Sequence, residues 1–237
     1  VLDLRCDDPE FRPVLSLQEL VGQEEACARI ERQLRQGRFP HAMVFEGPRG
    51  VGKGTAAEVV TRLVLCAGRD PDDLVACGQC PACAKLDAGT HADVQRLEPD
   101  GTYIKIDAVR EATRGLTLRP VEGGHKILII NEAERMNAAS QNALLKTLEE
   151  PPGDAHIFLI TDRPQRLLPT VLSRCGRVRF LPVPLDEVKR RLTTAGLGDG
   201  TAELVASMTH GSLGAAFETD AEDLTARRDV VAALVAV

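Results

Sequence analysis

Aromatic side chains are scarce in this chain, which has no tryptophan, one tyrosine and six phenylalanines among 237 residues. The core must therefore consist mainly of leucine, valine, isoleucine and alanine, and a nucleic-acid-binding face of stacked aromatic rings is not expected. Long apolar runs are missing too, and none approaches the roughly 20 residues of a membrane-spanning helix. The first residues show no basic segment followed by an apolar stretch, so we expect no signal peptide, no membrane partner and a cytoplasmic address.

Positive charge is also in deficit, because 29 Lys and Arg residues stand against 35 Asp and Glu residues, giving a net charge of −6. An acidic chain is a poor candidate for gripping DNA over its whole surface, although it can still carry a local basic patch. In other respects the composition, 43% hydrophobic and 27% charged, is that of a soluble globular protein. The length suits one large domain, or one medium and one small domain.

Short apolar runs bounded by turn residues alternate with helical patterns over the first 183 residues. The runs begin at His41, Ala92, His125, Ala155 and Gly176. Strands that alternate with helices predict an α/β fold whose parallel sheet is covered on both faces. After Pro184 only helical patterns remain, so we expect a core domain over residues 1–183 and a small all-α domain over 184–237.

The stretch GPRGVGKGT begins at Gly47 and has the pattern of a phosphate-binding loop with one substitution. It follows an apolar run and opens a helical pattern, which is the context that the motif needs. Gly50 and Gly52 would let backbone N–H groups turn toward a phosphate at a helix N-terminus, and Lys53 would reach the outer phosphates. The alternative is a glycine-rich turn between a strand and a helix that binds nothing.

The residues expected to hold magnesium depart from the motif. Gly54 stands where a Ser or Thr hydroxyl is required, and Thr55 cannot replace it because one step along a helix turns a side chain by about 100°. In KILIINEAE an apolar run ends where two acids usually follow, the first steadying the metal and the second polarising water. Asn131 replaces the first acid and Glu132 keeps the second, and an amide is a weaker magnesium ligand than a carboxylate. A buried strand followed by a polar turn is the alternative.

Four of the seven cysteines cluster in the pattern C-x10-C-x2-C-x2-C. They are Cys66, Cys77, Cys80 and Cys83, whereas the other three are scattered. In a reducing compartment four thiolates at this spacing predict a closed tetrahedral site, which zinc favours. Such a site leaves no open position for catalysis, so the zinc would be structural. Free or disulfide-bonded cysteines are the alternative.

Several stretches carry a resemblance to a known family. They are QNALLKTLEEPP (Gln141–Pro152), LLPTVLSRC (Leu167–Cys175), DAGTHADV (Asp87–Val94) and the cysteine module. Together they resemble the bacterial DNA polymerase III clamp loader, an AAA+ ATPase assembly, over the chain from about Val21 onward. The resemblance implies a five-stranded AAA+ core with a zinc module inserted at about 66–90. It also implies a helical lid over 184–237 and a third, helical collar domain that this sequence does not contain.

The resemblance further implies roles for single residues. Motor subunits of the family bind and hydrolyse ATP, whereas another subunit class has a decayed nucleotide site. Gly54, Asn131 and Gly214 depart from the motor pattern, the last of them standing where motor subunits carry a lid arginine that touches the phosphates. Arg174 of the SRC triplet, which spacing alone would leave as a surface residue, would reach the nucleotide of a neighbouring subunit. Thr161 completes the expected nucleotide-contacting set, for which we expect weak or absent ATP/Mg²⁺ binding.

The expected function is that of a subunit without intrinsic ATPase activity that supports ATP-dependent loading of the sliding clamp on primed DNA. It would be a component of a DNA-directed DNA polymerase (nucleotidyltransferase) holoenzyme. Its partners would be the other clamp-loader subunits, with the clamp and primed DNA reached through the assembled complex.

One alternative is a motor ATPase subunit whose motifs carry unusual residues. A self-contained P-loop enzyme would need a catalytic base, for which no His–Asp or carboxylate pair offers itself. A zinc-stabilised nucleic-acid-binding module is disfavoured by the scarce aromatics.

Overall fold

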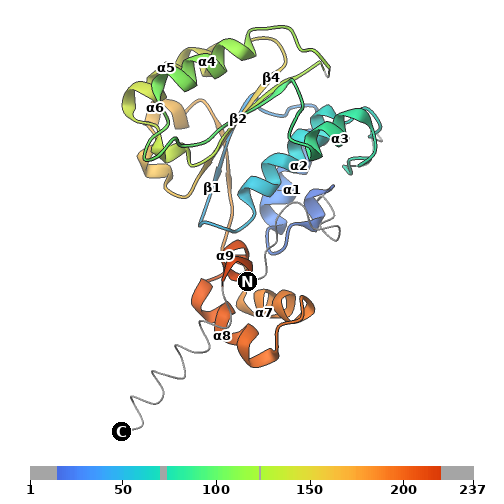
Figure 1. Cartoon of the computed structure of the whole chain (residues 1–237). Helices are drawn as coiled ribbons and strands as arrows, with labels where there is room; N and C mark the ends of the chain where they lie inside the picture. The colour runs from blue at the N-terminus through green and yellow to red at the C-terminus, as the bar shows by residue number, and fades with distance from the viewer. Residues whose placement is uncertain (1–14, 70–73, 123, 220–237) are drawn as a thin grey trace. The chain divides into compact units, whose positions relative to one another are not determined.

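The structure is a computed structural model that describes residues 15–69, 74–122 and 124–219 (Figure 1). Contacts divide the chain into two compact units, and the division falls between Phe180 and Leu181. The larger unit comprises Pro13–Gly47 and Lys53–Phe180, and the smaller includes Pro48–Gly52 and the chain from Leu181 onward. No helix in the described ranges is long and apolar enough to cross a membrane.

A five-stranded parallel sheet forms the centre of the larger unit. Its strands are β1 (Ala42–Glu46), β2 (Val94–Leu97), β3 (Lys126–Ile130), β4 (Ala155–Thr161) and β5 (Gly176–Arg179). They pair in the order β2-β3-β4-β1-β5, and every pair is parallel. All five apolar runs of the sequence thus become strands, and the predicted α/β fold with a parallel sheet is confirmed.

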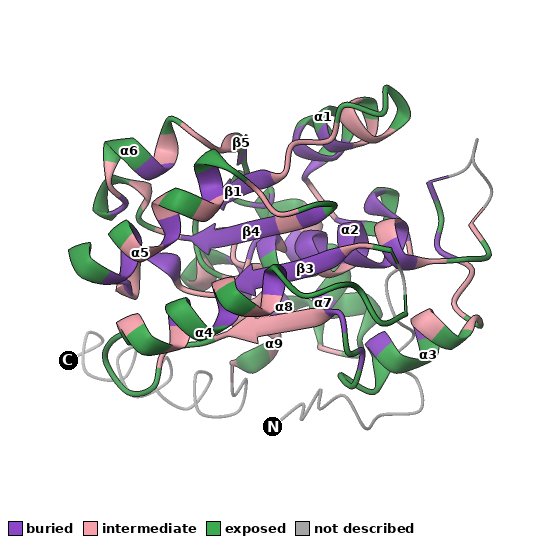
Figure 2. Cartoon of the chain, turned by 90° about the horizontal axis from the view of Figure 1, so that it is seen from above, coloured by how far each residue is buried: buried purple, intermediate pink, exposed green. Residues whose placement is uncertain are grey.

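Helices cover both faces of this sheet (Figure 1). The main helices of the larger unit are α1 (Glu24–Arg35), α2 (Lys53–Leu65), α3 (Pro81–Asp87), α4 (Ile106–Leu116), α5 (Ala138–Glu149) and α6 (Pro169–Leu172). One hydrophobic cluster joins sheet residues such as Val44 and Leu128 to α4, α5 and α6. β1 and β3 are buried along their whole length, as Figure 2 shows in purple, because parallel strands are covered on both sides.

The smaller unit contains three described helices after the sheet. They are α7 (Leu185–Thr194), α8 (Asp199–Thr209) and α9 (Leu213–Glu218). Val188 and Leu192 on α7 and Val205 on α8 are buried, as expected for helices that pack through one apolar stripe each. The helical pattern of 221–237 and Cys6 lie outside the described residues.

Candidate nucleotide and zinc sites

Three neighbouring strands bring expected nucleotide-contacting residues to one edge of the sheet. Lys53 begins α2 shortly after β1 ends, Asn131 follows β3, and Thr161 is the last residue of β4. Because β1 and β3 both pair with β4 in parallel, these residues share the carboxyl edge, where α/β sheets bind their ligands. The topology therefore places the expected residues where a nucleotide site belongs.

Backbone geometry ties the start of the phosphate-binding loop to this edge. The Gly47 amide donates to the Thr161 carbonyl at 3.2 Å, and the Lys53 ammonium donates to the Gly47 carbonyl at 2.8 Å. Gly47 has a φ of +148°, and a Cβ placed there would come within 2.3 Å of the Phe180 carbonyl oxygen. Only glycine fits this turn, whatever the loop binds.

Asn131 is used as a hydrogen-bond donor. Its side-chain amide donates to the Glu98 carboxylate at 3.1 Å. An aspartate at 131 could not make this bond and would bring two carboxylates together. The next residue, Glu132, adopts a left-handed φ of +47° and pairs with Arg135 at 2.9 Å. The position that holds magnesium in the motif thus carries an amide committed to an internal contact.

The Thr161 hydroxyl is also engaged within the chain. It donates to the Glu134 carboxylate at 2.7 Å and accepts from the Arg163 amide at 3.1 Å. Burial, together with a hydrogen bond to the Asp162 carboxyl, raises the pKa of Glu134 above its ordinary value. Thr161 and Glu134 therefore form part of a hydrogen-bonded group at the ends of β3 and β4.

The space around Gly54 is open, since a Cβ placed there meets no heavy atom within 4 Å. Gly54 lies in the first turn of α2 and is exposed. We therefore expect Gly54→Ala to stabilise the protein by about 0.5–1 kcal/mol, because glycine is a poor helix former. Gly47→Ala is the matched control and should destabilise it, because of the close approach described above. Urea titration of both variants measures the two changes, and a destabilised Gly54→Ala would contradict the open space.

In the smaller unit, Gly214 packs directly against the phosphate-binding loop. Its amide donates to the Gly50 carbonyl at 2.9 Å, and a Cβ on Gly214 would approach the Gly50 Cα to 3.1 Å. The Ser212 hydroxyl caps α9 by accepting from the Ala215 amide at 3.2 Å. A side chain at position 214 would fit only if the backbone at Gly50 shifted slightly. The third departure from the motor pattern thus has a steric counterpart in the packing.

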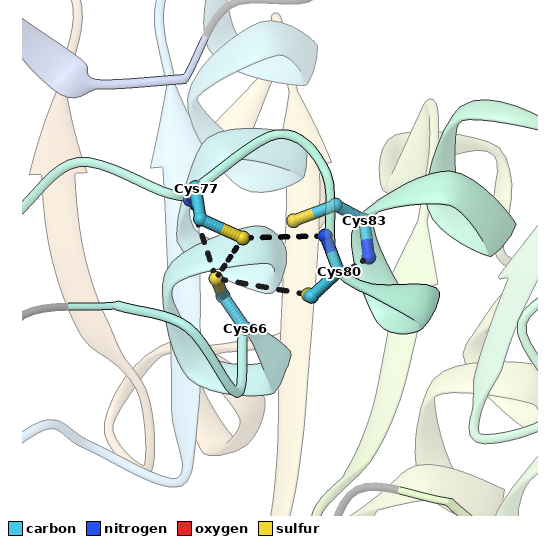
Figure 3. Close-up of side chains that lie close together, drawn as sticks. All are labelled: Cys66, Cys77, Cys80 and Cys83. Carbon is cyan, nitrogen blue, oxygen red and sulfur yellow. Dashed lines mark hydrogen bonds between the residues drawn. The ribbon is translucent and has the colours of Figure 1, made fainter.

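The four clustered cysteines meet at one point, as Figure 3 shows. Cys66 follows α2, Cys77 lies in the connecting loop, Cys80 caps α3 and Cys83 is in its first turn. Their sulfur atoms all lie within 4.8 Å of one another, and Cys66 Sγ is 3.5 Å from Cys77 Sγ and 3.9 Å from Cys80 Sγ. With Zn–S bonds of about 2.3 Å, the edge of a zinc tetrahedron is about 3.8 Å. The donor set and spacing fit a zinc ion held by four thiolates.

Backbone amides around the cluster point at the sulfurs. Amides of Cys77, Cys80 and Cys83 donate to the preceding cysteine sulfur at 3.3 Å, 3.3 Å and 3.5 Å. Burial alone raises the pKa of the Cys80 thiol, but amide and thiol hydrogen bonds lower it to about 6. Burial raises the pKa of Cys83 to about 12. A metal ion bound to all four sulfurs would have to displace the thiol protons that burial favours.

Arg174 lies at the opposite edge of the sheet from Lys53. Gly176, two residues later, pairs with Met43 near the amino end of β1, whereas Lys53 follows its carboxyl end. The Arg174 side chain is 34% exposed and pairs with Glu149 at 2.6 Å. It also donates to the Thr170 carbonyl at 2.9 Å. This register places Arg174 away from the chain's own Lys53, and its side chain is partly exposed.

Gln141, which sequence reasoning did not single out, joins the two motifs of the resemblance. Its side chain is 2% exposed and donates to the Met136 and Arg166 carbonyls at 3.0 Å and 3.1 Å. Its carbonyl oxygen accepts from the Leu168 amide at 2.6 Å. Gln141 thereby holds the start of the LLPTVLSRC segment against α5. Its position in QNALLKTLEEPP was the available signal, but two of its partners, Arg166 and Leu168, are 25 and 27 residues away.

A cavity of about 300 Å³ also escaped sequence reasoning. It is lined by Gly101, Thr102, Tyr103, Glu134, Arg135, Arg163 and Arg166. The arginines come from separate segments, so no run of basic residues in the sequence indicates the cavity. The arginines add local positive charge to an acidic chain.

Comparisons with known proteins agree on one family. The family model described as DNA polymerase III, delta subunit, matches residues 22–184. Delta' subunits of DNA polymerase III from Bacillus subtilis and Pseudomonas aeruginosa are 34% and 40% identical over 76% and 69% of this chain. The chain spans about half the length of these relatives, 54% and 49%.

A solved structure supports the same assignment. A DNA polymerase III gamma-subunit-related protein from Thermotoga maritima superposes with a TM-score of 0.56 at 26% identity, covering 83% of this chain and 60% of that one. The Thermotoga maritima RuvB branch migration motor, at 20% identity and a TM-score of 0.56, covers 87% and 63% and shows the fold alone. The chain therefore belongs to the DNA polymerase III delta subunit family, as a delta'-like clamp-loader subunit with an AAA+ fold.

Proposed function

We propose that this chain is a non-hydrolysing clamp-loader subunit that supports ATP-dependent loading of the sliding clamp on primed DNA. Other clamp-loader subunits are its direct partners, and it meets the clamp and the DNA through the assembled complex. In this proposal Arg174 acts in trans on the nucleotide of a neighbouring motor subunit. The observation that carries it is the bond from Asn131 to Glu98, because an internal hydrogen bond occupies the magnesium-holding position.

The rest of the phosphate site supports the same proposal. Gly54 provides no hydroxyl for magnesium, and Gly214 provides no cation for the phosphates. Gly47, Gly50, Gly52 and Lys53 keep the loop geometry, which suits a weakly held phosphate or a retained scaffold. A motor subunit needs metal ligands and phosphate cations together, so their combined loss favours the non-hydrolysing class.

ATP turnover by the isolated chain is expected to be negligible. Magnesium would have poor ligands at Gly54 and Asn131, so the charge that develops on the transferring phosphoryl group would not be neutralised. Phosphate release at saturating ATP and magnesium measures this, with Lys53→Ala as the background control. Magnesium-dependent turnover that Lys53→Ala abolishes would revive the motor alternative.

Variants that restore the missing magnesium ligands test the same site through nucleotide binding. Gly54→Thr fits the open space at α2, but Asn131→Asp would face the Glu98 carboxylate in place of the present hydrogen bond. Repulsion from Glu98 would turn the new carboxylate away, whereas an amide at position 98 can donate a hydrogen bond to it and hold it in place. We therefore expect magnesium-dependent nucleotide binding to improve more when Glu98→Gln accompanies the pair.

Reconstitution tests the function as a whole. This subunit is combined with motor subunits, clamp and primed DNA, and clamp loading is followed with and without it. The proposal expects co-assembly and loading that depends on this subunit. Assembly without any effect on loading would contradict it.

We also propose that the cysteine cluster holds a structural Zn²⁺. The fit of the sulfur spacing to a tetrahedron supports this, as do the amides that point at the sulfurs. The zinc would fix the loop between α2 and α3.

A further inference from the structure

The end of α5 contacts Arg174 through a carboxylate. Glu149 is the last residue of α5, and its Oε1 lies 2.6 Å from the Arg174 Nη2. On the other side, the Arg174 Nη1 donates to the Thr170 carbonyl of α6 at 2.9 Å and to the Ser173 hydroxyl at 3.3 Å. Acceptors from two elements therefore fix the plane of one guanidinium group.

This contact completes a two-point attachment of the segment that carries Arg174. Gln141, near the start of α5, holds the Arg166 carbonyl and the Leu168 amide just before α6. Glu149, at the end of the same helix, holds Arg174 just after α6. The two motifs QNALLKTLEEPP and LLPTVLSRC are thus bonded to each other at both ends.

The position of α5 is itself fixed at its C-terminal end. The His41 ring nitrogen Nε2 bonds to the Leu148 carbonyl at 3.0 Å, and Leu148 is buried in the core cluster. The chain then leaves the helix through Pro151 and Pro152, which cannot continue it. Glu149 therefore stands on a rigid support next to a helix end.

The pair contributes little to folding. Both side chains are partly exposed, Glu149 by 50%, and surface ion pairs are screened by water and salt. What the pair does fix is direction, because a free arginine side chain has many rotamers and loses them when it binds a phosphate. The Thr170, Ser173 and Glu149 acceptors can engage three of the five guanidinium N–H groups. In the described contacts, the remaining N–H groups stay available to donate to phosphate oxygens.

We propose that Glu149 is a positioning residue that holds Arg174 ready for the nucleotide of a neighbouring subunit. The inference rests on the proposed function of Arg174 in trans. Preorganised donors stabilise a transition state without a cost of reorganisation, so the effect belongs in kcat. KM for ATP, which reports on binding by the motor subunit, should stay the same.

The test compares Glu149→Gln with Glu150→Gln in the reconstituted clamp loader. Glu150 is the next residue, is also exposed, and loses the same charge. We expect Glu149→Gln to lower kcat for DNA-stimulated ATP hydrolysis about fivefold at unchanged KM, as expected for one charge-assisted bond. Glu150→Gln should match the natural protein. Equal effects of the two variants would overturn the inference, and so would faster hydrolysis by Glu149→Gln, which would make Glu149 a restraint.

A double-mutant cycle separates this inference from the proposed function. In an Arg174→Ala background, Glu149→Gln should have no further effect, because its action passes through the arginine. If Arg174→Ala alone leaves hydrolysis unchanged, the proposed function fails. If Arg174→Ala lowers it while Glu149→Gln does not, only the positioning role fails. Equal melting temperatures of the Glu149 and Glu150 variants would show that stability is not the cause.

Discussion

Zinc removal is expected to unfold residues 74–90 while the five-stranded sheet stays folded. Structural zinc in small peptides is worth roughly 10–16 kcal/mol of apparent binding energy, which exceeds the stability of many domains. The segment has little regular structure of its own, because α3 is a seven-residue helix. Helices shorter than about 12–15 residues are marginal in water without tertiary support.

We do not expect the contacts of this segment with the rest of the chain to replace the metal. Arg62 on α2 pairs with Asp87 at the end of α3 at 2.5 Å, and Lys85 pairs with Glu122 at 2.5 Å. Val75 forms a β-bridge with Ser16, and Leu74, Ala76 and Leu86 are buried. Burying one leucine contributes about 1.5–3 kcal/mol, and a half-exposed ion pair contributes less. We expect these contacts to orient the segment when zinc is bound, but not to offset the chain entropy of its loop.

Hydrogen exchange with and without a zinc chelator measures the result. Amides of α3 should lose protection at once, whereas amides of β3 and β4 should keep theirs. Cys77→Ser should lower the zinc content below one ion per chain. Cys27→Ala, which removes a buried cysteine of α1 outside the cluster, should keep it at one. Protein purified without chelator that contains no zinc would contradict the site.

The sheet could be predicted because its signal is local. KILII and AHIFLIT are apolar runs of strand length. A strand that is buried on both faces is expected to be almost continuously hydrophobic, so such runs indicate a parallel sheet. The phosphate-binding loop was equally visible, since its glycines are required by backbone geometry. Gly47 shows this, because any Cβ there would meet the Phe180 carbonyl.

The parts that sequence reasoning missed depend on contacts that only the folded chain shows. α3 begins where Cys80 caps it and Pro81 fits its first position, so the cysteine cluster determines its start. The identity of Asn131 showed that an acid is missing from the motif. Only the structure shows that its side-chain amide donates a hydrogen bond to Glu98. Likewise Arg174 could be recognised only by resemblance, and Glu149 became its partner only through the packing of α5 against α6.

Replacing Arg174 is expected to have the largest effect on activity. An arginine that reaches a transferring phosphoryl group is worth on the order of 10³–10⁵ in rate in well-studied GTPases. Its guanidinium stays charged and binds two phosphate oxygens in a fork, whereas lysine offers a single point charge. At the amino edge of the sheet Arg174 is remote from the chain's own Lys53, so its target would be a nucleotide held by another subunit.

The measurement is ATP hydrolysis by the reconstituted clamp loader carrying Arg174→Ala. Only the active site that this arginine would complete should lose its activity, so single-turnover hydrolysis should show a slow fraction rather than a uniform decrease. Arg174→Lys should recover little of that fraction, because the charge remains but the fork is lost.

Arg110→Ala is the control, because it removes an exposed arginine of α4 and should leave every site active. Zinc content and melting temperature should be equal in all three variants, since the Arg174 side chain is partly exposed and packs outside the core. Hydrolysis and clamp loading at the natural rate with Arg174→Ala would make Arg174 an ordinary surface residue, held by Glu149 for no purpose in catalysis.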